Sequence, residues 1–324
     1  MKPWPYLAAV LALSLLVMAA AYAATRTWAM EAPCDARGYS DDAYLAYCQN
    51  AAFGDYEHAA YDRLLEPRAV ANARKAEVVF LGNSRLQVAF SRPATDAFFA
   101  SRGAPYHLLG FSYGESAPFA FRVFHELGLK PRVLIVNVAP FFVPAWSPAA
   151  VVEVRYNWKT RVDMLLKAAT QSLHRFLCDR DPGPCPGGSE SVFRSRATGQ
   201  WIWAAARSSP HAEPFGPPPP FADAPAIASD AALAEELLAN SGVPPPCVIL
   251  TQVPEPSADY APLVDAVARR TGATAVLPRL SGLATFDGSH LDRGSGDAWA
   301  AAFFREAAPA IDRCLGTPMT EAVP

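Results

Sequence analysis

The sequence lacks the features that mark nucleic-acid-binding proteins and zinc proteins. Its 28 basic and 31 acidic residues give a formal net charge of −3, with neither a basic stripe nor an acidic tail. The electrostatic case for a nucleic-acid partner is therefore absent. No C-x-x-C or H-x-x-x-H spacing supports a zinc site. We expect neither a nucleic-acid partner nor a metal or organic cofactor.

An uncharged segment near the N-terminus has the composition of an export signal. It covers residues 3–25, is rich in Leu, Ala and Val, and is flanked by Lys2 and Arg26. Its 23 residues are enough to span a bilayer, which favours an uncleaved signal anchor. The alternative is a signal peptide that is removed at the small-x-small site Ala21-Tyr22-Ala23. In both cases residues 1–25 direct the rest of the chain to export.

The six cysteines agree with export, because disulfides form and persist in oxidising compartments. Six cysteines can pair in many ways, and sequence alone does not choose among them. Taken in chain order, the pairs are Cys34 with Cys48, Cys178 with Cys185, and Cys247 with Cys314. The second pair is the best supported, because the proline and glycine residues between its cysteines would hold a tight loop closed.

A strand followed directly by a serine is the first candidate site. Residues 77–81, Glu-Val-Val-Phe-Leu, contain four consecutive apolar residues, two of them β-branched. Such a run predicts a strand that is buried on both faces, as in a parallel sheet. The turn Gly82-Asn83-Ser84-Arg85 follows. Ser84 is therefore predicted at the carboxyl end of the strand, where α/β sheets collect ligands and catalytic groups.

Strands and helices then alternate, which predicts an α/β fold with a doubly wound, three-layer, five-stranded parallel sheet. The domain would cover residues 75–316, with a helical N-terminal cap at 26–74 and a tail at 317–324. A helical, proline-rich insertion at about 140–230 would lie over the catalytic edge of the sheet. The other strands are predicted at 106–109, 132–138, 247–253 and 274–277, and the main helices at 93–102, 115–127, 231–240, 262–271 and 297–314.

A second serine competes with Ser84 for the role of nucleophile. Residues 110–114, Gly-Phe-Ser-Tyr-Gly, match the G-x-S-x-G nucleophile elbow of α/β-hydrolases, after a predicted strand and before a predicted helix. An α/β-hydrolase reaches its elbow only after several strands, whereas one clear strand precedes Ser112. Position in the fold therefore favours Ser84, and Ser112 stays open as the alternative.

A carboxylate and an imidazole lie three residues apart before the last predicted helix. They are Asp287 and His290, within residues 285–291. On a loop, this spacing can turn both side chains to one edge, so that the carboxylate sets the tautomer of an imidazole facing the serine. Ser84, His290 and Asp287 would then be the nucleophile, the general base and its orienting acid.

Taken in chain order, the short motifs around these residues resemble those of the SGNH (GDSL-like) hydrolase superfamily. The resemblance rests on Gly82-Asn83-Ser84 after the first strand, a glycine-containing turn after the second, an asparagine in the third, and Asp287-x-x-His290. Within this superfamily, the chain looks most similar to membrane-anchored proteins of the bacterial envelope, such as those associated with alginate O-acetylation and teichoic acid D-alanylation. This similarity rests on the leader, on the Gly-Asn-Ser-Arg motif and on the Val-Asn-Val-Ala-Pro-Phe-Phe motif. The resemblance implies Ser84 as nucleophile, His290 as base and Asp287 as its orienter.

The resemblance also implies an oxyanion hole. Its donors would be the backbone N–H of Ser84, the N–H of Gly114 or Gly110, and the side chain of Asn137. Asn137 lies in Val-Asn-Val, without the Gly-x-Asn-Asp turn that is common in the family, so this chain departs from the pattern there.

Two residues beside Ser84 are candidates for binding substrate. They are Asn83 and Arg85, and the guanidinium of Arg85 suits a carboxylate or phosphate. The alternative for Arg85 is a salt bridge at the strand end.

Two functions fit these observations. The first is an exported serine esterase or O-acyltransferase that acts on an acylated envelope glycan or another ester. The second is a catalytically silent protein of the same fold that binds glycans or assists a membrane acyltransferase partner. The resemblance places the domain in the bacterial periplasm, held in the inner membrane by a single N-terminal helix, or free there after signal cleavage.

Overall fold

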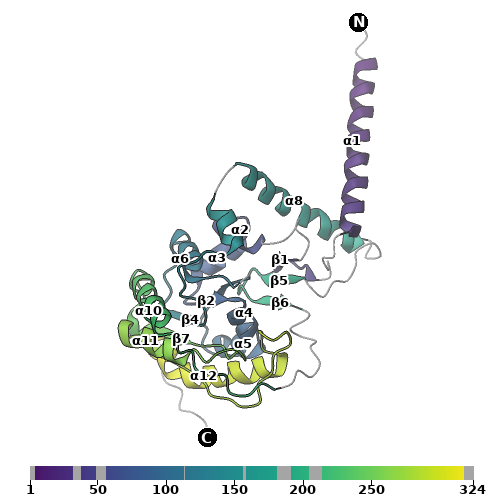
Figure 1. Ribbon diagram of the computed structural model, residues 1–324. Helices are drawn as coiled ribbons and strands as arrows, with labels where there is room; N and C mark the ends of the chain where they lie inside the picture. The colour runs from purple at the N-terminus through teal and green to yellow at the C-terminus, as the bar shows by residue number, and fades with distance from the viewer. Residues whose placement is uncertain are drawn as a thin grey trace.

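A five-stranded parallel sheet forms the centre of the protein (Figure 1). The structure, a computed structural model, describes residues 4–31, 38–48, 56–112, 114–155, 158–180, 191–203 and 214–316. The strands are β2 (Val78–Asn83), β3 (Tyr106–Phe111), β4 (Val133–Asn137), β7 (Val248–Thr251) and β8 (Thr274–Ala275). Their order is β3-β2-β4-β7-β8, and each neighbouring pair is parallel. The predicted α/β class with a five-stranded parallel sheet is therefore confirmed, and the strand order is flavodoxin-like.

Two hydrophobic layers cover the two faces of this sheet. Successive strand residues point to opposite faces, so in β2 Val79 and Leu81 pack into one layer while Val78 and Phe80 pack into the other. The first layer includes α3 (Pro67–Lys75), α6 (Ala117–Glu126), α10 (Ala224–Ala239) and α11 (Ala261–Thr271), and the second includes α4 (Ser84–Phe90), α5 (Pro93–Ala100) and α12 (Arg293–Leu315). Every residue of β2 is buried, as its unbroken apolar run predicts.

A second, antiparallel sheet joins the N-terminal cap to the insertion. Its order is β1-β5-β6, with β1 at Ala43–Tyr47, β5 at Val192–Ser195 and β6 at Trp201–Trp203. The cap is thus helical only in part, through α2 (Tyr56–Asp62) and α3, and the insertion adds two strands to α7 (Pro148–Val154) and α8 (Trp158–Arg180). The sequence analysis did not predict these three strands. β1 pairs with residues about 150 positions away, and local periodicity carries no information about so distant a partner.

The N-terminal helix α1 (Trp4–Glu31) projects from the body of the protein (Figure 1). Its apolar side chains include Leu11 and Leu16, which are 63% and 69% exposed. Within the ranges that the structure describes, no helix combines the length and the apolar character needed to cross a membrane.

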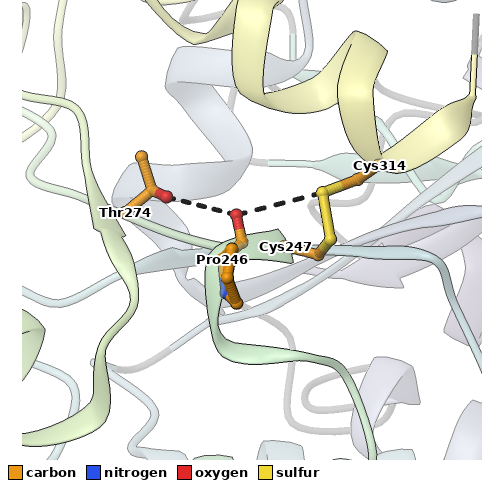
Figure 2. Close-up of a disulfide and its surroundings, with 4 residues drawn as sticks. All are labelled: Pro246, Cys247, Thr274 and Cys314. Atoms are coloured by element: carbon orange, nitrogen blue, oxygen red, sulfur yellow. Dashed lines mark hydrogen bonds between the residues drawn. A yellow bond between two sulfur atoms is a disulfide. The ribbon is translucent and has the colours of Figure 1, made fainter.

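A disulfide closes the C-terminal part of the fold. Cys247 bonds to Cys314, which is the chain-order pairing that the sequence left open, and links the start of β7 to the end of α12 (Figure 2). Beside it, the carbonyl of Pro246 accepts a hydrogen bond from Thr274 Oγ1 at 3.2 Å. Cys48 and Cys178 also belong to disulfides. Cys34 and Cys185, their predicted partners, lie outside the described residues, so those two pairings stay predictions.

Candidate active site

Three side chains form a continuous chain of hydrogen bonds at the carboxyl edge of the parallel sheet. His290 Nε2 lies 2.8 Å from Ser84 Oγ, and His290 Nδ1 lies 2.6 Å from Asp287 Oδ2. The structure therefore brings together the serine, histidine and aspartate that the sequence analysis selected. The geometry is that of a nucleophile, its base and the group that orients the base.

The loop before α12 fixes the imidazole. Asp287 Oδ1 accepts hydrogen bonds from the backbone N–H groups of Ser289 and His290, at 2.9 and 2.8 Å. Gly288 makes this turn possible, because its φ of +83° lies in the left-handed region. Burial raises the pKa of Asp287, but the hydrogen bonds and charge of His290 and the two backbone bonds outweigh it and leave the pKa below its usual value. The aspartate is therefore a carboxylate at neutral pH, as an orienting group must be.

Ser84 is placed by the junction between β2 and α4. Asn83 is the last residue of β2 and the N-cap of α4, and its side chain accepts a hydrogen bond from the Arg85 N–H at 3.1 Å. Ser84 is the first residue of the helix and is partly exposed. The chain turns directly from strand to helix at the serine, so its hydroxyl points out of the sheet edge toward the His290 loop.

A small cavity opens beside Ser84. Its volume is about 160 Å³, and it is lined by Tyr47, Ser84, Ser112, Val192, Trp201, Trp203 and His290. β1, β5 and β6 thus supply its walls, so the N-terminal cap and the insertion complete the site. A larger cavity of about 650 Å³, lined mainly by residues of the 215–218 and 277–283 segments, includes none of the three hydrogen-bonded residues.

Two aromatic rings pack against the imidazole of His290. Phe286 stacks on His290 with 5.8 Å between ring centroids, and Trp203 meets the same imidazole edge-on at 5.6 Å. A backbone hydrogen bond also joins these two residues across the loop, since the Phe286 N–H donates to the His290 carbonyl at 3.0 Å. These contacts restrict the rotation of the imidazole ring.

Ser112 does not have the geometry of a nucleophile elbow. In an elbow the helix begins at the serine, whereas α6 begins at Ala117. Ser112 lies in a turn, is 7% exposed and lines the same cavity as Ser84. His290 is already hydrogen-bonded to Ser84, so the base faces Ser84.

The proposed oxyanion residues have other roles in the described structure. Asn137 is fully buried, where its Oδ1 accepts from the Val253 N–H at 2.9 Å and its Nδ2 donates to the Ala139 carbonyl at 3.1 Å. Gly110 lies inside β3, where a Cβ would meet Gln87 Cγ at 2.7 Å. Gly114 is an exposed turn residue with a φ of +62°. None of the three lines the cavity beside Ser84.

Asn83 and Arg85 are held by protein groups. Besides capping α4, Asn83 donates from Nδ2 to the Pro140 carbonyl at 3.2 Å, and it is 2% exposed. Arg85 Nη2 lies 2.6 Å from Glu255 Oε2, and Arg85 Nε donates to Ser289 Oγ at 3.2 Å. Arg85 therefore links α4 to the loop that carries His290, in agreement with the salt-bridge alternative.

The sequence analysis missed a buried glutamate that supports the site. Glu57, from α2 of the cap, is fully buried and accepts a hydrogen bond from the Ser112 N–H at 2.6 Å. Its other oxygen accepts from Arg194 Nη1 and Trp201 Nε1, each at 3.1 Å. A glutamate among polar helix residues gives no signal of burial, because its partners come from three distant segments.

The site contains no evident metal centre. In the part of the chain that the structure describes, no three His, Cys, Asp or Glu side chains cluster closely enough to hold a metal ion.

Comparisons of the chain with protein-family models, with curated proteins and with solved structures found no match.

Proposed function

We propose that the protein is an exported serine esterase or O-acyltransferase. The observation that carries this proposal is the hydrogen-bonded chain from Asp287 through His290 to Ser84, at the edge of a parallel sheet where α/β enzymes bind their substrates. The partly exposed serine and the cavity beside it give an ester access to the nucleophile.

The chemistry follows from this arrangement. Ser84 Oγ attacks the ester carbonyl carbon while His290 Nε2 takes the hydroxyl proton. The tetrahedral intermediate collapses, the ester oxygen leaves with that proton, and an acyl-Ser84 ester remains. A water molecule or a sugar hydroxyl then gives a proton to His290 and attacks the acyl group, and Ser84 recovers its proton. Asp287 holds the imidazole in the required tautomer and stabilises the imidazolium.

The substrate class and the location rest on the sequence. The strand-linked Gly-Asn-Ser-Arg block and the Asp-x-x-His block resemble SGNH hydrolases of the bacterial envelope, and the leader has the composition of an export signal. We therefore place the catalytic domain in the periplasm, anchored by the predicted signal anchor at residues 3–25 or released by cleavage. Its proposed substrates are acyl esters of envelope glycans, and its proposed partner is a membrane acyltransferase.

A second function is favoured by one observation. The amide of Asn137 is tied to backbone groups, so the site lacks this donor of the family's oxyanion hole. Loss of one such donor lowers the rate of an enzyme by a factor of about 10² to 10³. A catalytically silent protein that binds glycans or assists an acyltransferase is the alternative.

Labelling by a fluorophosphonate and turnover of p-nitrophenyl acetate separate the two. We expect the full chain in detergent to react with the probe at Ser84 and to hydrolyse the ester, and we expect Ser84→Ala to lose both activities. Ser101→Ala removes an exposed serine at the end of α5 and should behave like the wild type. A correctly folded wild type that shows neither labelling nor turnover would contradict the enzyme proposal and favour the silent one.

A further inference from the structure

The hydroxyl of Ser112 is buried beside Ser84 without a hydrogen-bond partner among the described residues. The backbone of Ser112 is held firmly, because its N–H donates to Glu57. Trp203 also lines this cavity, and its buried indole N–H likewise has no hydrogen-bond partner within the described ranges. An unpaired buried polar group costs about 1 to 3 kcal/mol. The cavity therefore suits a ligand that brings acceptor oxygens to these two donors.

The two serines are neighbours because their strands are paired in register. In the β2–β3 pair, Asn83 lies opposite Phe111, so Ser84 and Ser112 directly follow the paired ends of the two strands. Adjacent strands lie about 4.8 Å apart. Both residues line the same cavity. A carbonyl carbon under attack by Ser84 would therefore have its oxygen within reach of Ser112.

We propose that the Ser112 hydroxyl is an oxyanion donor, and that the cavity receives a short acyl group. This inference rests on the proposed function and specifies its substrate class. Ser112 donates to the ester carbonyl oxygen and to the oxyanion that forms when Ser84 attacks, in place of the amide of Asn137. The other walls come from Tyr47, Val192, Trp201 and Trp203. The volume of about 160 Å³ equals the share of about five water molecules in the liquid, which fits an acetyl-sized group better than a long acyl chain.

Variants at Ser112 test the donor directly. We expect Ser112→Ala to lower kcat/KM for p-nitrophenyl acetate about 10²-fold, the loss typical of one oxyanion donor. Ser112→Cys keeps the size but loses the strong donor, and it should be as slow. Ser112→Thr keeps the hydroxyl and should recover at least about a tenth of the wild-type rate. The pH profile should not change, because His290 and Asp287 are intact. Equal rates in wild type and Ser112→Ala would overturn the proposal, as would equal losses in the Cys and Thr variants.

Binding to an inactivated protein separates this inference from the proposed function. In Ser84→Ala, the affinity for 2,2,2-trifluoroethyl acetate can be measured by ¹⁹F NMR whether or not the wild type is an enzyme. We expect tighter binding of the acetate than of the hexanoate, and about a 10-fold weaker Kd when Ser112→Ala is added, as for loss of one buried hydrogen bond. An inert wild type with this binding pattern would refute the esterase but support the acyl site. Absence of binding, or no effect of Ser112→Ala on it, would refute the site.

A different observation, on helix α8, supports a second inference. α8 exposes large apolar side chains at Trp158, Val162, Leu165 and Phe176, which are 69%, 46%, 50% and 50% exposed. Their spacings of four, three and eleven residues place them on one face of the helix. We call these four residues the α8 face. Single exposed apolar residues are ordinary, but a face of four indicates an interaction surface.

The opposite face of α8 is attached to the protein. Gln171 is buried and forms two hydrogen bonds with the backbone of Leu45 in β1, donating to its carbonyl at 2.9 Å and accepting from its N–H at 3.3 Å. Met164 is buried on the same inner side. The α8 face cannot turn inward while these contacts hold, so it needs an external partner.

We propose that the α8 face lies in the interfacial region of a lipid bilayer. In Figure 1, α8 lies at the end of the molecule from which α1 projects, and it runs across the direction of α1. If residues 3–25 form the signal anchor that their composition predicts, this arrangement places α8 along the bilayer surface. The helix carries five Lys or Arg residues against two Asp, which favours anionic lipid headgroups. This arrangement would hold the Ser84 site at a fixed height above the membrane.

Photocrosslinking of the full chain tests this proposal. p-Benzoylphenylalanine is placed at Val162, at Leu13 of α1 as a comparison, and at the exposed Ala232 of α10 as a control. The protein is reconstituted in vesicles of phosphatidylethanolamine and phosphatidylglycerol. We expect lipid adducts at Val162 and Leu13 and none at Ala232. Adducts at Leu13 alone, adducts at neither helix, or a crosslinked dimer through Val162 would each contradict the proposal, and the dimer would identify a second copy as the partner.

Discussion

Glu57→Gln should destabilise the protein strongly although it changes the shape of the side chain very little. Glu57 and Arg194 are both fully buried, and the carboxylate is the negative partner of the guanidinium at 3.1 Å. Glutamine leaves the Arg194 charge unpaired, and removal of one partner of a buried ion pair typically costs 3 to 5 kcal/mol. Arg194 keeps hydrogen bonds to the carbonyls of Gly199 and Leu108, so we expect about 3 kcal/mol.

Urea unfolding followed by circular dichroism measures this loss. With m between 1 and 3 kcal/mol per M, the midpoint should fall by about 1 M or more. Glu126→Gln is the matched control, because its carboxylate is 44% exposed in an ion pair with Arg122 and should contribute less than about 1 kcal/mol. Adding Arg194→Met to Glu57→Gln removes the unpaired charge and should recover part of the stability. A Glu57→Gln midpoint equal to that of the control would refute the argument.

Three further predictions concern the catalytic acid, a buried histidine and the disulfide. Asp287→Asn should lower kcat for p-nitrophenyl acetate by about 10³ to 10⁴ with little change in melting temperature, and a loss below tenfold would contradict its orienting role. Burial and the charge of Arg194 lower the pKa of His107 to about 3. The unfolded chain takes up this proton near pH 6.5 and the folded chain does not, so stability falls as pH falls, by about 2 kcal/mol between pH 7 and 5. Between pH 7 and 5, the urea midpoint should fall less in His107→Gln than in the wild type, and an equal fall would refute His107 as the cause of the pH dependence. Replacing Cys247 and Cys314 by Ser opens a loop with a sequence separation of 67 residues. The chain-entropy relation gives a loss of about 4 kcal/mol. The rate at Ser84 should stay the same because Cys247 lies before β7, at the opposite edge of the sheet, and a lower rate in folded protein would count against this separation.

The parallel sheet and the candidate triad of Ser84, Asp287 and His290 could be predicted from local sequence. Residues 78–81 and 133–136 are unbroken apolar runs, and such runs arise where both faces of a strand are covered. Asp287 and His290 are close in sequence, so their shared loop could be inferred from spacing alone. Position in the fold also favoured Ser84 over Ser112, and His290 hydrogen-bonds to Ser84 in the structure.

The residues that line the cavity beside Ser84 could not be predicted from the sequence, because they are brought together by contacts between distant segments. Tyr47 and Val192 meet only through the pairing of β1 with β5. The role of Asn137 was also hidden, since its amide bonds to Val253 in a loop that follows another strand. Burial of Glu57 depends on Arg194 and Trp201 in the insertion. Each of these contacts is long-range, and composition and periodicity describe only short windows of the chain.

Trapping of the acyl-enzyme tests the central claim most directly. The full chain is mixed with p-nitrophenyl acetate, quenched in acid within one turnover, and digested for peptide mass spectrometry. We predict one acetyl group on the peptide that carries Ser84 and none on the same peptide of Ser84→Ala. The amount of p-nitrophenol released should equal the amount of acetylated peptide. Acetyl on Ser112, or release of p-nitrophenol by folded wild type with no acetyl on Ser84, would contradict the assignment of Ser84 as the nucleophile.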